Sequence, residues 1–584
     1  MIAIIVMIYQ RFGTKSIEDS QMKKIKNILQ YHLILWFILL QLCLFAGNNI
    51  FPRLVLQNEI YLTICRYFPI MVYLPKFALL AVLFIIWWFY TLEIFYRHKT
   101  LRKWLFLNDR HQYRGYSYID LIKLLNVKRS DPERLLEDDL EFLKPWECDG
   151  IPFGMIGSFL AYRKTKDKGN VLCVGMPGSG KTNFLAIPTA VQFGKRTPAH
   201  IFCIDIKGDI LENVGDKRNV KKFVPHDHKS SCCFDAFRVV RGKDEDTQIE
   251  FFTNLALMLI EDDPHSSQYF TKGGRDIFIA CCLYALKSNA NSTLHDIAVL
   301  LRSNDYDSLV DLIAESGNET AYNFVREYEN QKSSDVAGCY SHAVSGTQLF
   351  AQKRMKYLLA CDSGYESIDE FKNKTLEDIN NMIPMSADDF ENGYDIFLEI
   401  REDDLKQLAP LVSLIVDSFA LELLSRENGI EGSNTPILML LDEFASFNRM
   451  QNVLELQAKG RSKSCTVMIL CQSFDQLYLH YSDHEVQTMV DNSPYKCVLS
   501  ASGATAKYFS EMAGNIKTLT TSANEAQGDF SRSTKSASEK EEPFITPTAL
   551  GNLHEKEEML LIYNGKHARV KLMPFYKWPA SQRH

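Results

Sequence analysis

The residues best suited to chemistry stand in one short stretch, "NVLCVGMPGSGKTNFL", which covers residues 170–185. An apolar run leads into a glycine-rich loop and a pattern compatible with a helix follows, which is the context that a phosphate-binding P-loop requires. The glycines let backbone N–H groups turn inward on phosphate oxygens, and the N-terminal dipole of the helix adds to the attraction. The residues predicted to bind nucleotide here are Gly175, Gly178, Ser179, Gly180, Lys181 and Thr182. We expect Lys181 to reach the β- and γ-phosphates and the Thr182 hydroxyl to bind Mg²⁺.

A P-loop needs a second carboxylate for the metal, and "PILMLLDEF" supplies it. Asp442 ends a continuous apolar run, at the carboxyl end of a predicted buried strand, where α/β sheets bind their ligands. We expect Asp442 to hold Mg²⁺ through water. Glu443 follows directly, at a position that suits the general base of a hydrolase, which polarises the attacking water.

Two further polar residues complete the candidate site. Gln472 ends the apolar run "TVMILCQ", where its amide can sense the γ-phosphate, and a simple strand-end cap is the alternative. Arg461 lies in "AKGRSKS", between this run and the one that ends in Asp442. An arginine there could reach the nucleotide of a neighbouring subunit and stabilise transition-state charge. Taken alone, Arg461 would be better explained by a surface salt bridge.

The elements that must position these residues form an alternating α/β pattern from residue 169 onward. Continuous apolar runs predict strands buried on both faces of a doubly wound parallel sheet. The predicted strands are 171–175, 201–205, 395–400, 437–442, 466–471 and 496–500. Between about 255 and 385 only helical spacing occurs, which predicts an all-α insertion. The long separation of Lys181 from Asp442 argues against kinases and small GTPases, and no LSGGQ motif of ABC proteins is present.

The N-terminal region of the 584-residue chain has the composition of a membrane anchor. Helices are expected at about 28–51 and 76–96, because both regions carry uncharged apolar runs of a length that approaches or reaches a bilayer span. Lysines precede the first helix and the basic segment 97–103 follows the second, so both ends are predicted to be cytoplasmic. The 14 cysteines include no CxxC pair, which suits a reducing compartment. The net charge of −7 argues against a protein that simply coats nucleic acid.

These patterns together predict a chain of five parts. They are a transmembrane hairpin (1–100), a juxtamembrane linker (101–150), a nucleotide-binding domain in two pieces (151–255 and 386–584) and the all-α insertion (256–385). Within the second piece, the Ser-, Thr- and Glu-rich segment 520–542 is predicted to be a mobile loop. A β-hairpin with an Asn-Gly turn is predicted over 558–576.

The motifs together resemble the type IV coupling proteins, the TraG/TraD-like DNA-transfer ATPases of conjugation and type IV secretion. The similar blocks are the P-loop, "HIFCIDIKGDI", "LLDEFASF", "LQAKGRSKSCTVMILCQSFDQLYLHY" and the terminal hairpin, which together cover roughly residues 150–575. The second block departs from the DPKGE pattern of the family, since Ile206 replaces the proline and Asp209 the glutamate. This departure leaves the roles of Asp205 and Lys207 open.

The resemblance implies a RecA-like P-loop NTPase core in an ATPase that forms a ring, expected to be hexameric, anchored as a multi-pass protein in the bacterial cell membrane with its bulk in the cytoplasm. It implies ATP and Mg²⁺ as cofactors, and single-stranded DNA with its relaxase, or an effector protein, and the components of a type IV secretion channel as partners. By this resemblance Lys181 and Thr182 bind nucleotide and Mg²⁺, Asp442 and Glu443 serve metal and hydrolysis, Gln472 senses the nucleotide, and Arg461 acts in trans. The all-α insertion would dock substrates, because no long tail follows the terminal hairpin.

Two alternatives stay open. An FtsK-like DNA translocase shares the membrane helices and the motor core, although the sequence shows no C-terminal winged-helix DNA reader. A substrate-docking receptor with a weak ATPase would keep the same fold with less chemistry.

A zinc site in "PHDHKSSCC" is also considered, formed by His226, His228, Cys232 and Cys233. The adjacent cysteines fit zinc spacing poorly, so a loop with solvated histidines and packed thiols is expected instead.

Overall fold

The computed structural model describes residues 140–583, apart from 158, 215–216, 262–266, 330, 361–382, 429–433 and 524–534. All described residues belong to one compact unit, Ile122–His584. The membrane hairpin predicted over 1–100 and most of the predicted linker over 101–150 lie outside the described residues.

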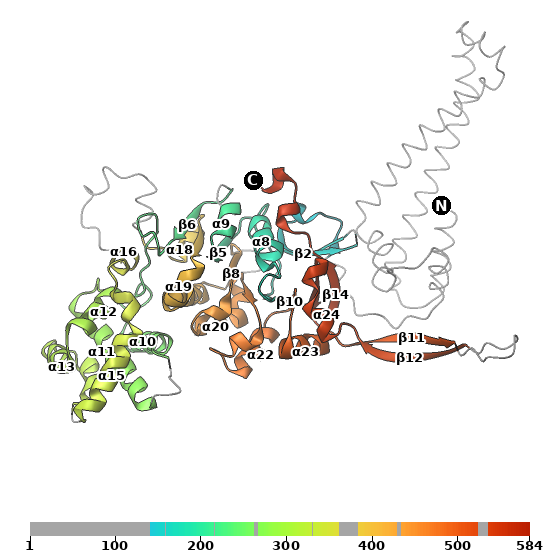
Figure 1. Ribbon diagram of the computed structural model, residues 1–584. Helices are drawn as coiled ribbons and strands as arrows, with labels where there is room; N and C mark the ends of the chain where they lie inside the picture. The colour runs from blue at the N-terminus through green and yellow to red at the C-terminus, as the bar shows by residue number, and fades with distance from the viewer. Residues whose placement is uncertain are drawn as a thin grey trace, which may run out of the picture. The chain divides into compact units, whose positions relative to one another are not determined.

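A twelve-stranded mixed sheet runs through the unit (Figure 1). In spatial order its strands are β1 (Leu140–Glu141), β3 (Phe159–Lys164), β2 (Gly150–Ile156), β14 (Lys566–Lys571), β13 (Glu558–Tyr563), β10 (Tyr495–Val498), β4 (Val171–Val174), β9 (Cys465–Cys471), β8 (Ile437–Leu441), β5 (His200–Ile206), β7 (Asp395–Ile400) and β6 (Val220–Phe223). The seven strands from β10 to β6 are parallel, and the remaining neighbours are antiparallel. The six predicted strands and the terminal hairpin are therefore confirmed.

The parallel part of the sheet is doubly wound. The connections β4–β5 and β5–β6 cross towards β6, and they carry α8 (Ile187–Gln192) and α9 (Asp209–Val214). The connections β7–β8, β8–β9 and β9–β10 cross back, and they carry α19 (Leu405–Ser425), α20 (Gln451–Lys459) and α22 (Asp483–Asp491). Because such crossovers are right-handed, the two groups must cover opposite faces of the sheet, and Figure 1 shows them on opposite sides of β5 and β8.

Helix α19 forms the centre of the core. In the described part of the chain, residues Glu402–Ser425 make the one helix long and apolar enough to cross a membrane, and 72% of its apolar window is buried inside the protein. Phe419 of α19 packs 4.8 Å, between ring centroids, from Phe202 of β5. This helix is therefore covered by the sheet and its neighbouring helices.

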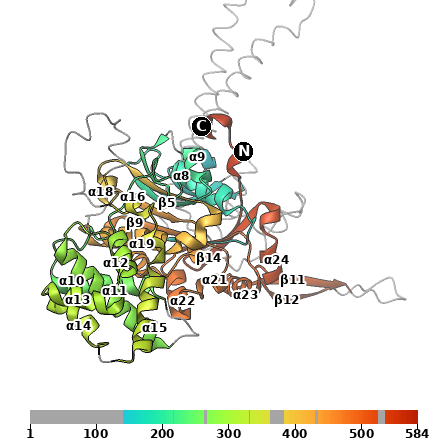
Figure 2. The ribbon, with the colours of Figure 1, turned by 60° about the vertical axis from the view of Figure 1, so that its left-hand side comes forward.

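The described residues between β6 and β7 form helices and turns, and no strand occurs among them. The helices include α10 (Glu245–Leu259), α11 (Gln268–Ser288), α12 (Leu294–Ser303), α13 (Tyr306–Glu315), α14 (Glu319–Arg326), α15 (Ser333–Gly346) and α16 (Met355–Leu358). They gather at one end of the unit in Figures 1 and 2. The buried apolar cluster runs without a break from the sheet through α19 and α10 into these helices, so the insertion shares the core of the sheet.

Three elements depart from the sequence expectations. The hairpin β2–β3 and the edge strand β6 were not among the predicted strands; β6 was hidden by the lysines of its sequence VKKF. The predicted loop 520–542 is wrong in part, because β11 (Asn515–Ala523) and β12 (Lys535–Pro543) pair there as an antiparallel two-stranded sheet. Threonine favours strands, and three threonines occur in β11, a propensity that outweighs the polar composition.

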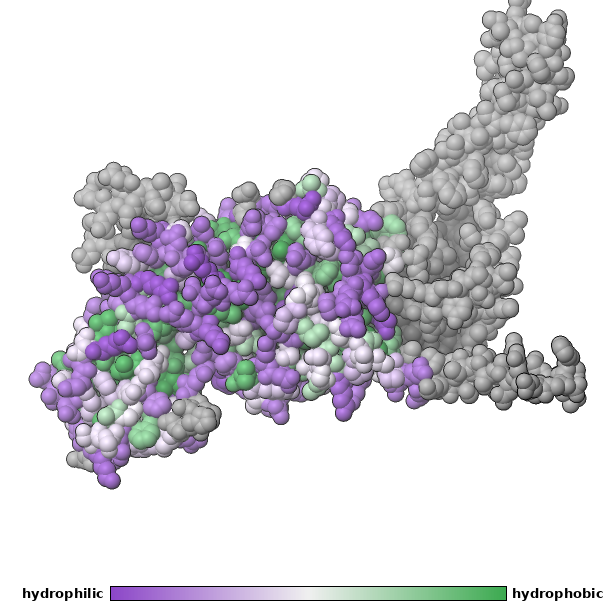
Figure 3. All heavy atoms as spheres, viewed as in Figure 1, coloured by the Kyte–Doolittle hydropathy of each residue, from purple (hydrophilic) through white to green (hydrophobic). Residues whose placement is uncertain are grey.

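The face of the unit seen in Figure 3 is mostly hydrophilic, with smaller hydrophobic areas between. The most exposed large apolar side chain of the described residues is Leu479, which is 75% exposed and follows α21 (Phe474–Leu477).

Candidate nucleotide-binding site

The glycine-rich loop lies at the carboxyl end of β4 and is shaped by two left-handed glycines. Gly178 has φ 76° and Gly180 has φ 81°. A Cβ atom at Gly180 would stand 2.6 Å from the ring of Phe184, so the loop accepts no side chain there. The loop leads into a π-helical segment that begins at Thr182 and continues as α8. The predicted order of strand, glycine loop and helix is thus present.

The side chain of Lys181 is buried within the glycine-rich loop. Its Nζ donates to the carbonyl oxygen of Gly175 at 2.8 Å and lies 3.5 Å from Glu443 Oε1, and the residue is only 6% exposed. Ser179 Oγ is buried and has no hydrogen-bond partner among the described residues. A buried hydroxyl without a partner is costly, and an oxygen-rich ligand in the loop would satisfy it.

A row of polar side chains continues from Lys181 across two neighbouring strands. Glu443 Oε2 accepts a hydrogen bond from Gln472 Nε2 at 3.0 Å, and Gln472 Oε1 accepts one from Gln476 Nε2 at 3.1 Å. The strand β9, which Gln472 follows, lies between β4 and β8, so all three strand ends meet at one edge of the sheet. Glu443 itself has φ 48°, an uncommon left-handed backbone for a non-glycine residue.

Two buried carboxyls lie beside this row, and both are poorly solvated. Burial raises the pKa of Asp442 to about 7, with the charge of Glu443 adding to the effect and that of Lys181 opposing it. Burial also raises the pKa of Asp205, to about 6. Carboxyls crowded in this way are stabilised as anions by a bound divalent cation, so their raised pKa values suit a metal-binding edge.

The structure shows which contacts are made by the altered block "IDIKGD", residues 204–209. Asp205 accepts hydrogen bonds from the backbone N–H groups of Ile210 (3.2 Å) and Leu211 (2.7 Å), which lie in the first turn of α9. Lys207 has φ 87°, and its Nζ forms an exposed ion pair with Glu402 at 3.0 Å. Asp205 is thus a helix-capping residue, and Lys207 projects from the same edge of the sheet as the P-loop.

Arg461 is not brought to this site. It lies in the short 3-10 helix Gly460–Lys463, which precedes β9, and its side chain is exposed. Because β4, β8 and β9 are parallel, the start of β9 is at the edge opposite to the one that holds Lys181 and Glu443.

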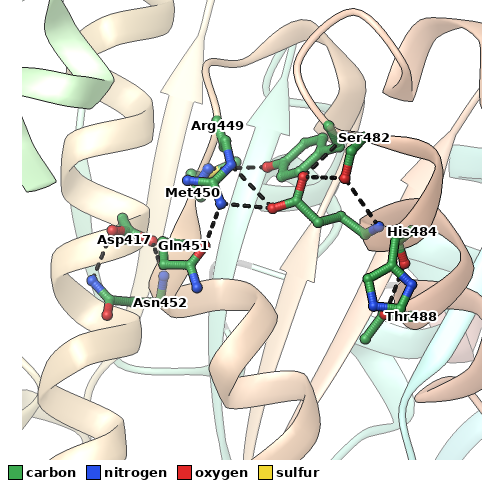
Figure 4. A network of polar contacts seen from close by, with 10 residues as sticks. Asp417, Arg449, Met450, Gln451, Asn452, Ser482, His484 and Thr488 are labelled. Atoms are coloured by element: carbon green, nitrogen blue, oxygen red, sulfur yellow. Dashed lines mark hydrogen bonds and ion pairs between the residues drawn. The ribbon is translucent and has the colours of Figure 1, made fainter.

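The segment that follows Glu443 is fixed by a polar network (Figure 4). Asp417 of α19 accepts from the backbone N–H of Asn452 at 2.7 Å and from its side-chain Nδ2 at 2.8 Å, at the start of α20. Arg449 donates to Glu485 at 2.6 Å, and the Tyr481 hydroxyl accepts from the backbone N–H of Met450 at 3.1 Å. These contacts anchor the chain between β8 and α20 to helices on either side.

The considered zinc site receives no support from the geometry. Among the described residues, no group of three or more His, Cys, Asp or Glu side chains is arranged to hold a metal ion. Cys232 and Cys233 are buried, whereas His228 is exposed and stacks on Tyr357 with ring centroids 5.1 Å apart.

Sequence reasoning assigned no role to two residues that support the site. Gln476 stands four positions after Gln472, within the QS-x-x-QL pattern, and orients its amide. Ser500 accepts from the backbone N–H of Met176 in the P-loop at 2.9 Å. It follows β10, which is adjacent to β4, and only the strand order reveals that proximity.

Known proteins resemble this chain in sequence and in fold. The sequence model of the family described as "Type IV secretory system Conjugative DNA transfer" matches residues 143–584. The type IV secretion system-coupling protein VirD4 of Bartonella quintana (strain Toulouse) is 20% identical over 426 residues, which are 68% of this chain and 62% of VirD4. The chain thus matches less than two thirds of the length of that relative.

Two solved structures show the same fold. The bacterial conjugative coupling protein TrwBdeltaN70, in its unbound monoclinic form, matches with a TM-score of 0.53 at 18% identity, covering 74% of this chain and 91% of that one. The plasmid coupling protein TrwB in complex with ADP and Mg²⁺ matches with a TM-score of 0.51 at 18% identity, covering 69% and 85%.

Proposed function

The chain belongs to the type IV secretory system conjugative DNA transfer family, and on this premise we propose that it is an ATP-hydrolysing motor that couples DNA and its relaxase, or an effector protein, to a type IV secretion channel. The observation that carries the proposal is the convergence of Lys181, Glu443 and Gln472 at one edge of the parallel sheet. A docking receptor would not need this row of contacts.

The residues present fit ATP and Mg²⁺. The backbone N–H groups between Gly175 and Gly180 would surround the phosphates, and Ser179 Oγ would gain a partner. Lys181 would exchange its contact with Glu443 for the β- and γ-phosphates, while Thr182 and Asp442 would hold Mg²⁺. The bound metal would neutralise charge on the phosphate oxygens during transfer.

Glu443 is the proposed general base. With Lys181 engaged elsewhere, Glu443 would keep the hydrogen bond from Gln472, which fixes its carboxylate for polarising water. Gln472 would in turn report the state of the γ-phosphate through Gln476 and α21.

Arg461 is proposed to act in trans. Its position at the opposite edge of the sheet excludes contact with the P-loop of its own chain, and its exposure leaves it accessible to a neighbour. We propose a ring, expected to be hexameric, in which Arg461 of one subunit completes the site of the next.

The five-part organisation is proposed as well. The hairpin over 1–100 would anchor the ring in the bacterial cell membrane, and the linker over 101–150 would lead to a cytoplasmic motor formed by 151–255 and 386–584. The helices over 256–385 would receive the substrate.

The test compares Lys181→Ala and Glu443→Gln with wild type for ATP hydrolysis by the full chain and for DNA transfer between cells. We expect both variants to lose hydrolysis and transfer, with Glu443→Gln still binding ATP. The matched controls Lys459→Ala and Glu455→Gln remove an exposed pair on α20 and should change neither readout. Equal low hydrolysis by wild type and Lys181→Ala would favour the docking receptor, and normal transfer by both site variants would refute the motor.

A further inference from the structure

Glu261 follows the C-terminal end of α10 and receives two side chains from the sheet domain. Asn448 Nδ2 donates to Glu261 Oε1 at 2.8 Å and lies 3.2 Å from the carbonyl oxygen of Met258, one of the last carbonyls of α10. His480 Nδ1 lies 3.5 Å from the same Glu261 oxygen. The exposed carboxylate of Glu261 in the insertion is therefore contacted by two segments of the sheet domain.

Those two segments start at the candidate site itself. Asn448 stands five positions after Glu443 (448 − 443), and His480 stands eight positions after Gln472 (480 − 472). The segments also contact each other, because the rings of Phe444 and Tyr481 stack with centroids 5.7 Å apart. The segments that follow Glu443 and Gln472 are thus linked both to each other and to Glu261.

On the insertion side, the end of α10 is held tightly by two further helices. Arg275 of α11 donates to the carbonyl oxygen of Ile260 from Nε at 2.8 Å and from a terminal nitrogen at 2.6 Å. At Gly346 of α15, a Cβ atom would stand 2.6 Å from Ile260 Cγ1 and 2.9 Å from the carbonyl oxygen of Leu259. The end of α10 that precedes Glu261 is therefore packed closely against α11 and α15.

We infer that Glu261 is the positioning residue through which the nucleotide site and the all-α insertion act on each other. The inference rests on the proposed function, because it needs a nucleotide to draw Lys181 away from Glu443 and so to shift Glu443 together with its partner Gln472. Coupling between two sites is reciprocal, so a substrate that shifts the insertion would also change the setting of Glu443 and Gln472.

The test is amide hydrogen exchange of the full chain in detergent, with and without saturating Mg²⁺ and a non-hydrolysable ATP analogue. In wild type we expect slower exchange at the P-loop and a change of about fivefold or more at residues 255–261 and 268–275. In Glu261→Ala the P-loop protection should persist while the response of the insertion is lost. Glu261→Gln keeps an acceptor for Asn448 and should retain the response.

The matched control is Glu250→Ala, which removes an exposed glutamate from the same helix and should behave like wild type. If wild type protects the P-loop and the insertion does not respond, or if Glu261→Ala responds like wild type, the inference is wrong and the proposed function stands. If the analogue protects no residue of the P-loop in wild type, the proposed ATP site is wrong and the inference falls with it.

Discussion

Asp417 provides a stability prediction that depends directly on geometry. It is buried in α19, and it accepts hydrogen bonds from the backbone N–H of Asn452 (2.7 Å) and from Asn452 Nδ2 (2.8 Å) (Figure 4). It also accepts one from the backbone N–H of Val453 (3.3 Å). These backbone groups belong to the first turn of α20, where they have no partner within the helix. Burial raises the pKa of Asp417 to about 7, although the hydrogen bonds and the charge of Arg449 oppose that rise.

The raised pKa sets both the sign and the size of the effect. Between the ordinary pKa of 3.8 and about 7, the folded protein retains a proton that the unfolded chain releases, so the free energy of unfolding falls as the pH rises. The full difference corresponds to about 4 kcal/mol, at about 1.4 kcal/mol for each pKa unit. Asp417→Asn cannot ionise and loses this dependence, at a cost of about 1 kcal/mol for one poorly oriented amide.

The measurement is the thermal midpoint of the full chain, for wild type and Asp417→Asn, from about pH 4 to about pH 8. We expect the variant to be less stable at the acid end and more stable at the alkaline end, with a relative change of several degrees. Asp311→Asn, an exposed change on α13, serves as the control and should follow wild type. Parallel curves for wild type and Asp417→Asn would show that Asp417 is already ionised in the folded state, and the argument from burial would be wrong.

Three further predictions concern the nucleotide site. Gly180→Ala combines a left-handed φ with a Cβ atom 2.6 Å from the Phe184 ring, so affinity for a fluorescent ATP analogue should fall about tenfold or more; unchanged affinity would contradict the loop geometry. Gln472→Ala removes the hydrogen bond to Glu443, so kcat for ATP should fall by about 10- to 100-fold with little change in KM, whereas a rise in KM alone would assign Gln472 to binding. Arg461→Ala should lose ATP hydrolysis. Mixing this variant with Lys181→Ala should restore part of the activity, because some subunit interfaces then combine an intact P-loop with an intact arginine. No recovery of hydrolysis in the mixture would argue against action in trans.

The strands around the site were predictable because they are buried on both faces. Strands such as β4, β8 and β9 are continuous apolar runs, which can be recognised in the sequence without knowing which strands lie next to them. Strand β6 was missed because it contains a buried lysine, Lys221. Its charge is compensated by a 2.7 Å ion pair with Asp389, a partner 168 positions away. The β2–β3 hairpin was missed because its antiparallel partner β14 comes from the far end of the chain.

The site itself was predictable only where its residues are local in sequence. The P-loop and the pair Asp442–Glu443 carry their own patterns, and the adjacency of β8 and β9 placed Gln472 near them. The contacts of Ser500 with the loop and of Asn448 with Glu261 depend on how distant segments pack. No periodicity or spacing in the sequence encodes such contacts.

The row from Lys181 to Gln476 explains why this arrangement is suited to a switch. In the structure Glu443 contacts the lysine that it would have to release before it can act as a base, since an ion pair with Lys181 opposes proton transfer from water. Lys181 can leave only for another anion, and the phosphates are the anions that the loop is shaped to hold. In the proposed mechanism, the binding of ATP would therefore free Glu443 to act as the base. Because Gln472 would remain bonded to Glu443, we expect the change to reach α21 and the segments that meet at Glu261 without any new contact.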